Sequence, residues 1–72
     1  MSKTETILRI KTHLHGLRNR YRCGDCLADT LHIAPSEIED AIVDLSAGDE
    51  HILVAPDECG QCNERKVCLI MR

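Results

Sequence analysis

Aromatic residues are almost absent from this sequence of 72 residues, which contains one Tyr, no Phe and no Trp. A hydrophobic core must therefore be built from Ile, Leu, Val and Ala. A chain of this length buries only about 60% of the surface of its unfolded form, so such a core is marginal. We expect one domain spanning residues 1–72, stabilised by a further element such as a bound metal ion.

Long apolar segments are also missing, since no run approaches the roughly 20 residues of a membrane-spanning helix. Residues 1–5 lack the basic and then apolar layout of a signal peptide. These absences predict a cytoplasmic protein without a segment inserted in a membrane. In that compartment the five cysteines are expected to be reduced thiols, metal ligands or redox groups, and an odd number fits a disulfide framework poorly.

Positive charge is absent from the middle of the chain. Residues 1–22 contain six Lys and Arg residues and one acidic residue, whereas residues 23–64 contain eleven Asp and Glu residues and no Lys or Arg. The segregation is compatible with a solvated surface, but it also predicts a basic patch near the first helix and an acidic face elsewhere.

Local patterns predict three helices and a small sheet. Ser2-x-x-Glu5 is a capping box, and apolar residues at spacings of three and four follow it, so the first helix should run to about Gly16 or Leu17. The second helix should span about residues 24–31. The third should follow the capping box Ser36-x-x-Glu39 and end at Gly48 as a C-terminal glycine. Residues 20–22 could form a short strand, and residues 51–55 and 66–71 are β-like, with a polar loop over 56–65.

This order of elements is that of an α+β winged helix, in which three helices carry a small antiparallel β-hairpin, the wing. Residues 27–38, Leu-Ala-Asp-Thr-Leu-His-Ile-Ala-Pro-Ser-Glu-Ile, resemble the helix-turn-helix core of small bacterial winged-helix regulators. His32 stands where that family usually has glycine. The resemblance implies a DNA-binding transcriptional regulator.

Two Cys-x-x-Cys pairs supply four thiols, the number that a tetrahedral zinc site needs. Cys23 and Cys26 fall at the start of the second helix, where free N–H groups favour thiolate, and Cys59 and Cys62 lie in the predicted loop. One zinc ion on these four cysteines is the first hypothesis, and free thiols or a reversible disulfide are an open alternative. Cys68, between Val67 and Leu69, is expected to be a small buried hydrophobe.

A second grouping uses the C-terminal cysteines alone. The spacing Cys59-x2-Cys62-x5-Cys68 resembles the last three cysteines of the small winged-helix protein of bacterial ferrous-iron transport, with Val54 in place of the first. That resemblance implies an iron–sulfur cluster and a role as cytosolic regulator of a metal transporter.

Nucleic-acid binding would depend on a basic edge. The candidate phosphate contacts come from the predicted first strand and the wing: Arg18, Arg20, Arg22, Arg65 and Lys66. The predicted third helix carries four carboxylates and no basic residue, which opposes its entry into a DNA groove. A protein-interaction adaptor that uses this acidic helix is therefore the alternative function. No motif for catalysis stands out, so we expect the protein not to be an enzyme.

Overall fold

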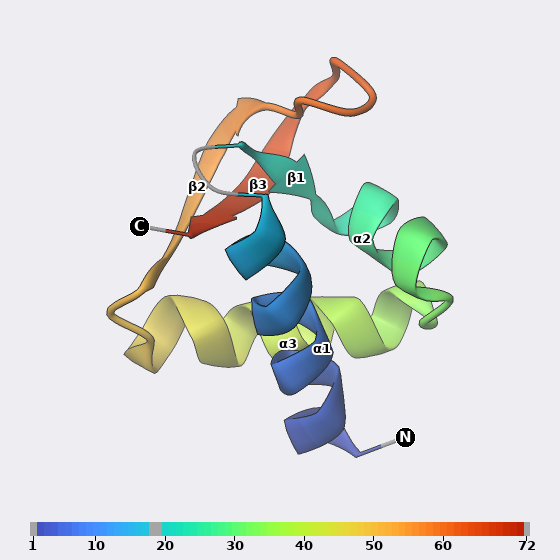
Figure 1. Ribbon diagram of the computed structural model, residues 1–72, viewed down its shortest axis with the longest axis vertical. Helices are drawn as coiled ribbons and strands as arrows, with labels where there is room; N and C mark the ends of the chain where they lie inside the picture. The colour runs from blue at the N-terminus through green and yellow to red at the C-terminus, as the bar shows by residue number, and fades with distance from the viewer. Residues whose placement is uncertain (1, 18–19, 72) are drawn as a thin grey trace.

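The computed structural model describes residues 2–17 and 20–71, and Figure 1 shows three helices and one small sheet. The elements follow the predicted order, and the α+β class with three helices and a small antiparallel sheet is confirmed. Their bounds are α1 Lys3–Gly16, β1 Arg22–Cys23, α2 Gly24–Leu31, α3 Pro35–Gly48, β2 Ile52–Glu58 and β3 Arg65–Met71.

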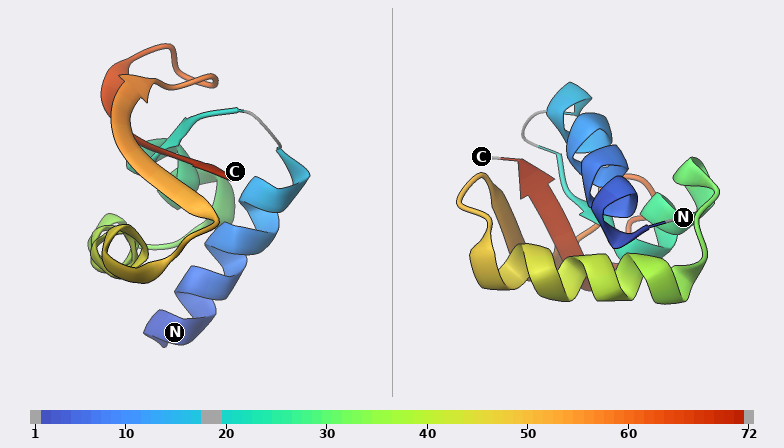
Figure 2. Two further views of the ribbon diagram at one scale, coloured as in Figure 1. Left: turned by 90° about the vertical axis from the view of Figure 1, so that its left-hand side faces the viewer. Right: turned by 90° about the horizontal axis from the view of Figure 1, so that it is seen from below.

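The sheet joins the two halves of the chain. Its strand order is β1-β3-β2, and both pairings are antiparallel. Strand β1 has only two residues, and Cys23 pairs with Cys68. Figure 2 shows α1 crossing α3 on one side of the molecule, while the loop between β2 and β3 bends toward β1. The start of α2 therefore lies beside a loop that is more than 30 residues away in sequence.

The helix starts are set by different residues. At α1 the Ser2 hydroxyl accepts a hydrogen bond from the Glu5 N–H at 3.2 Å, which confirms half of the predicted capping box. The second predicted capping box is wrong, because α3 begins at Pro35 and Ala34 is its N-cap. Proline suits the first helical position, since its fixed φ is helical and its missing N–H would have no partner there.

The helix ends also depart from simple patterns. Gly48 is the last residue of α3, as predicted, but it does not take the positive φ that is common for glycine at a helix end. Asp49 is the C-cap instead. The end of α2 has the left-handed residue, because His32 takes φ 56° and ψ 46°.

The strands are shifted from their predicted positions. The first lies at Arg22–Cys23 rather than at residues 20–22, and β2 continues through Pro56 to Glu58, where a loop was predicted. Proline is tolerated in β2 because β2 is an edge strand, and one side of its backbone needs no partner.

Two groups of buried residues hold the elements together. The larger is aliphatic, as predicted, and joins the three helices to the sheet through Ile10, Leu14, Leu27, Ala28, Ile33, Ile38, Ala41, Leu45, Ile52 and Leu69. The smaller consists of Cys23, Cys26, Cys59 and Cys68, against which Tyr21 packs. No helix within residues 2–17 and 20–71 is both long and apolar enough to cross a membrane.

Candidate metal centre

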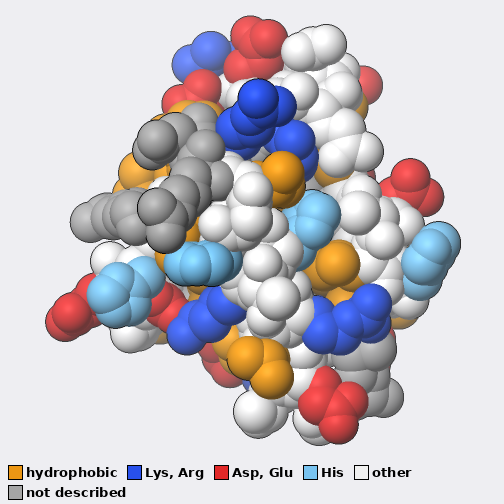
Figure 3. Space-filling model, in the orientation of Figure 1, with side chains coloured by type: hydrophobic (Ala, Val, Ile, Leu, Met, Phe, Trp, Pro, Cys, Tyr) orange, Lys and Arg blue, Asp and Glu red, His pale blue; other side chains and the backbone are white. Residues whose placement is uncertain are grey.

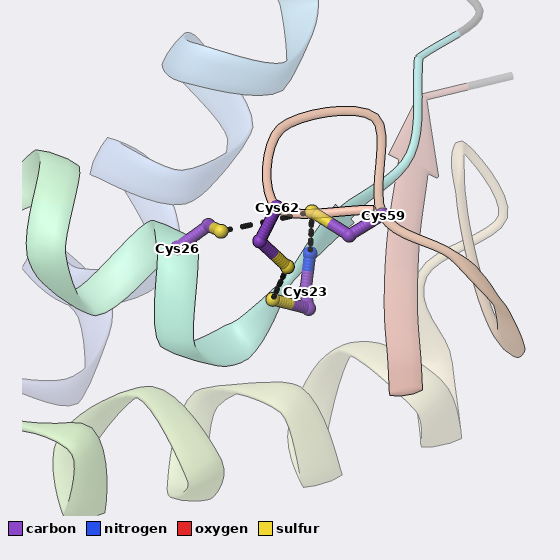
Figure 4. A group of neighbouring side chains, drawn as sticks. All are labelled: Cys23, Cys26, Cys59 and Cys62. Atoms are coloured by element: carbon purple, nitrogen blue, oxygen red, sulfur yellow. Dashed lines mark hydrogen bonds between the residues drawn. The ribbon is translucent and has the colours of Figure 1, made fainter. Parts of the chain in front are cut away.

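Four cysteines from two distant segments meet at one point (Figure 4). Cys23 ends β1 and is the N-cap of α2, and Cys26 lies in the first turn of that helix. Cys59 and Cys62 lie in the loop that joins β2 to β3. Their sulfurs all lie within 4.8 Å of one another. The structure thus brings together the four residues that the paired spacing predicted.

The distances between the pairs match a tetrahedral site. The sulfurs of Cys23 and Cys62 are 3.8 Å apart, and those of Cys59 and Cys26 are 3.6 Å apart. Zinc–sulfur bonds of about 2.3 Å with tetrahedral angles place two sulfurs about 3.8 Å from each other. The two short contacts connect α2 to the loop, so an ion among these sulfurs would join both segments.

Backbone N–H groups point at Cys59. The N–H groups of Cys23 and Gln61 each donate to the Cys59 sulfur, and both nitrogens lie 3.4 Å from it. Burial favours the thiol and raises the pKa of Cys59, but the N–H groups of Cys62, Cys23 and Gln61 favour the thiolate and together lower it to about 6. These N–H groups thus favour the thiolate of Cys59, which is the form that binds metal.

The neighbouring thiols behave in the opposite way. Burial raises the pKa of Cys26, and the adjacent Cys23 and Cys59 raise it further. Burial also raises the pKa of Cys23. These two cysteines therefore hold their protons beside the Cys59 thiolate, and a metal ion must displace those protons in order to bind.

Cys68 is buried beside this group but is not part of it. The four sulfurs that could share one ion are those of Cys23, Cys26, Cys59 and Cys62. The Cys68 thiol instead donates to the carbonyl oxygens of Asp57 and Lys66, both at 3.3 Å. Burial raises the pKa of Cys68, which keeps it as the thiol. The structure agrees with the prediction of a small buried side chain here, and the C-terminal grouping of cysteines is not the one that converges.

The loop is held beside the start of β1 by a main-chain contact that the cysteine spacing does not indicate. The Gly60 N–H donates to the Tyr21 carbonyl at 2.9 Å. A Cβ atom on Gly60 would lie 2.8 Å from Nη1 of Arg22 and 3.3 Å from the Tyr21 oxygen. Only glycine fits this approach without displacing Arg22. The one sequence signal for the contact was the glycine that follows Cys59.

The described residues of the predicted basic edge do not form a continuous surface. Arg22 is only 8% exposed, so the prediction that it contacts phosphate at the surface is wrong. The Lys66 ammonium lies 2.6 Å from the Asp25 carboxylate and 2.8 Å from the Glu64 carboxylate, so its charge is already paired. Arg20 and Arg65 are exposed, and Arg18 lies outside the described residues. Figure 3 shows Lys and Arg side chains in separate places on one face of the molecule.

The acidic helix keeps its charge on the surface. Glu39, Asp40 and Asp44 of α3 are exposed, with Val43 beside them at 65% exposure. Asp44 pairs with Lys3 of α1 at 3.5 Å. Between α3, the start of α2 and β3 lies a hollow of about 190 Å³, lined by Gly24, Asp25, Pro35, Ile38, Glu39, Ile42, Lys66 and Val67. The lining is mainly apolar, and its charged residues are Glu39 and the ion pair of Asp25 with Lys66.

Comparisons of the chain with protein-family models, with curated proteins and with solved structures found no match.

Proposed function

We propose that this protein is a winged-helix domain that binds one zinc ion through Cys23, Cys26, Cys59 and Cys62. The observation that carries the proposal is the convergence of the four sulfurs within 4.8 Å, with distances of 3.6 and 3.8 Å between the two segments. Four thiolates in tetrahedral geometry are typical of zinc or of iron–sulfur sites, and closed sites made of four cysteines are structural. The ion stabilises the fold by joining α2 to the loop between β2 and β3.

Metal analysis of protein purified without oxygen tests this site. We expect one zinc per chain and a colourless protein. A brown protein that contains iron and sulfide would support an iron–sulfur cluster at this site instead of zinc. Protein that takes up neither metal when its thiols are reduced would contradict a metal site and would leave free thiols or a reversible disulfide.

We further propose that the domain is a protein-interaction adaptor that works through α3. The helix has exposed carboxylates and no basic residue, and Val43 and the neighbouring hollow offer apolar contact. Carboxylates repel DNA phosphates but attract a basic protein surface. The cytosolic domain of a metal transporter is the partner that the cysteine resemblance implies, although only Cys59 and Cys62 of the three resembling cysteines belong to the converging group.

The DNA-binding regulator is the second candidate, and the element order of a winged helix favours it. In that case the candidate phosphate contacts among the described residues are the exposed Arg20 and Arg65. Changing both to Ala should then weaken binding to all DNA sequences equally and reduce its salt dependence.

One variant with two substitutions separates the two functions. Replacing Glu39 and Asp40 by Gln and Asn should weaken an adaptor's binding to a basic partner, whereas DNA binding should stay the same or strengthen. Gel shifts at low salt and capture of partners from lysate, followed by their identification, measure the two effects. If the unaltered protein shows no DNA affinity at low salt, the regulator function is excluded.

A further inference from the structure

Arg22 is a buried cation without an acidic partner among the described residues. It is 8% exposed, and the ion pairs found between described residues involve Lys3, Lys11 and Lys66 instead. Its Nη1 donates to the carbonyl oxygen of Tyr21 at 2.9 Å. No buried side-chain nitrogen or oxygen of the described residues lacks a hydrogen-bond partner, so the guanidinium nitrogens that make no hydrogen bond still reach water. A charge on a residue this little exposed is nevertheless normally paired with an opposite charge.

The loop that carries Cys59 and Cys62 lies against the Arg22 guanidinium. Arg22 directly precedes Cys23, and its Nη1 lies against Gly60, which directly follows Cys59. The Tyr21 carbonyl accepts from both Arg22 and the Gly60 N–H, so one oxygen fixes the guanidinium beside the loop. Both segments that carry the cysteines therefore contact or adjoin this side chain.

The charge of a filled site explains the arrangement. One Zn²⁺ with four thiolates has a net charge of −2, and this charge would lie in a largely buried group of residues. We propose that Arg22 is a positioning residue of the metal centre, which holds the Cys59–Cys62 loop in place and offsets the negative charge of the thiolates. This inference depends on the proposed metal site.

Zinc affinity gives the first test. Residues that support metal ligands commonly contribute 10-fold to 100-fold in metal affinity. We expect Arg22→Gln to weaken zinc binding by about tenfold or more in competition with a chromophoric chelator. Arg22→Lys keeps the charge and should restore most of the affinity. Arg20→Gln, which removes an exposed charge two residues earlier, is the control and should bind zinc as the unaltered protein does.

A reduction potential separates charge from packing. Four thiolates also bind iron, and the centre then has a net charge of −1 with Fe³⁺ and −2 with Fe²⁺. A nearby cation stabilises the more negative form. In iron-substituted protein, Arg22→Gln should therefore lower the one-electron potential, and Arg22→Lys should leave it nearly unchanged.

Two glycine variants test the same role if the Arg22→Gln protein does not fold. Gly60→Ala places a methyl group 2.8 Å from Nη1 and must displace the guanidinium while its charge is retained, so zinc binding should weaken. A Cβ at Gly48 meets nothing within 4 Å, so Gly48→Ala is the matched control.

Distinct results would overturn each proposal. If the unaltered protein binds no metal, the metal site fails and the role of Arg22 fails with it. If it binds zinc and Arg22→Gln binds zinc equally well, the role of Arg22 alone is wrong. Equal losses of affinity in Arg22→Gln and Arg22→Lys, with unchanged potentials, would reduce Arg22 to a packing residue and overturn the charge role.

Discussion

Cys62 and Cys68 differ in exposure, and the exposed cysteine is the one that we expect to matter more. Cys62 is exposed and completes the group of four, whereas Cys68 is fully buried and donates to two backbone carbonyls. Cys68→Ala should keep one zinc per chain and lower the free energy of unfolding by about 1 kcal/mol, because only a small cavity is created. Cys62→Ala should lose the zinc.

Metal analysis and urea unfolding of these two variants measure the contrast. Loss of zinc from Cys68→Ala would instead support the C-terminal grouping of cysteines and the resemblance that goes with it.

His32 is a second residue to test, because its backbone takes an unusual conformation. Its φ of 56° places it in the left-handed region, which costs most non-glycine residues about 1 kcal/mol. His32→Gly should therefore raise the free energy of unfolding by up to about 1 kcal/mol, since glycine adopts this conformation readily. Thermal unfolding measures the gain, with His15→Gly in α1 as a control that should destabilise. A loss of stability in His32→Gly would show that the imidazole makes a contribution greater than the backbone strain.

At the scale of elements, the step from α3 to β2 depends on Asp49. Its side chain is 10% exposed, pairs with Lys11 of α1, and accepts from the His51 N–H at 2.8 Å. Lys11 and then this N–H lower the pKa of Asp49 below its usual value near 3.8. The ionised form therefore stabilises the fold, fully above the unfolded pKa and less as pH falls through the folded pKa.

Asp49→Asn should accordingly be less stable than the unaltered protein at pH 7, and the difference should shrink below about pH 4. Urea unfolding across pH 7 to 2 measures it, with the exposed Asp40→Asn as control. Loss of zinc in acid affects all three proteins alike, so the difference between them reports the carboxylate. A difference in stability that persists at pH 2 would mean that Asp49→Asn destabilises the protein through altered packing and not through the lost charge.

The elements also show what the sequence could predict. Helices α1 and α2 were predicted almost to the residue, because apolar spacing and the Ser2 cap are local. The start of α3 was misplaced, since Pro35 and Ser36 both favour helix starts and the sequence does not show which of them lies at the first helical position. Strand β2 was cut short at Pro56, because a sequence does not reveal that a strand will lie at the edge of a sheet.

The candidate site was predictable only in part. Two Cys-x-x-Cys pairs identified the four thiols, but their meeting depends on the pairing of β1 with β3, which is a long-range contact. The burial of Arg22 was not foreseen, because two residues are too few for an alternating pattern to indicate which face of a strand is buried.

At the scale of the whole molecule, the two buried groups should respond differently to loss of metal. The aliphatic group joins α1, α2, α3 and the sheet, while the cysteine group joins β1 and α2 to the loop. Chelation should greatly increase hydrogen exchange in residues 21–26 and 59–64, and less in α1 and α3, whose contacts are apolar. Mass spectrometry of exchange with and without a chelator measures this.

Cys68→Ala serves as the control, because it alters the cysteine group without removing a proposed ligand. A uniform rise in hydrogen exchange over all elements would mean that the aliphatic core does not stay folded without the ion. No change in residues 21–26 would contradict a bound metal in the untreated protein.

The mixed exposure of the four cysteines has a consequence for the rate at which the site exchanges its ion. Three of the sulfurs belong to buried residues, and the fourth, at Cys62, belongs to an exposed one. An incoming thiolate can replace Cys62 at the metal while the other three stay bound, so exchange would not require unfolding.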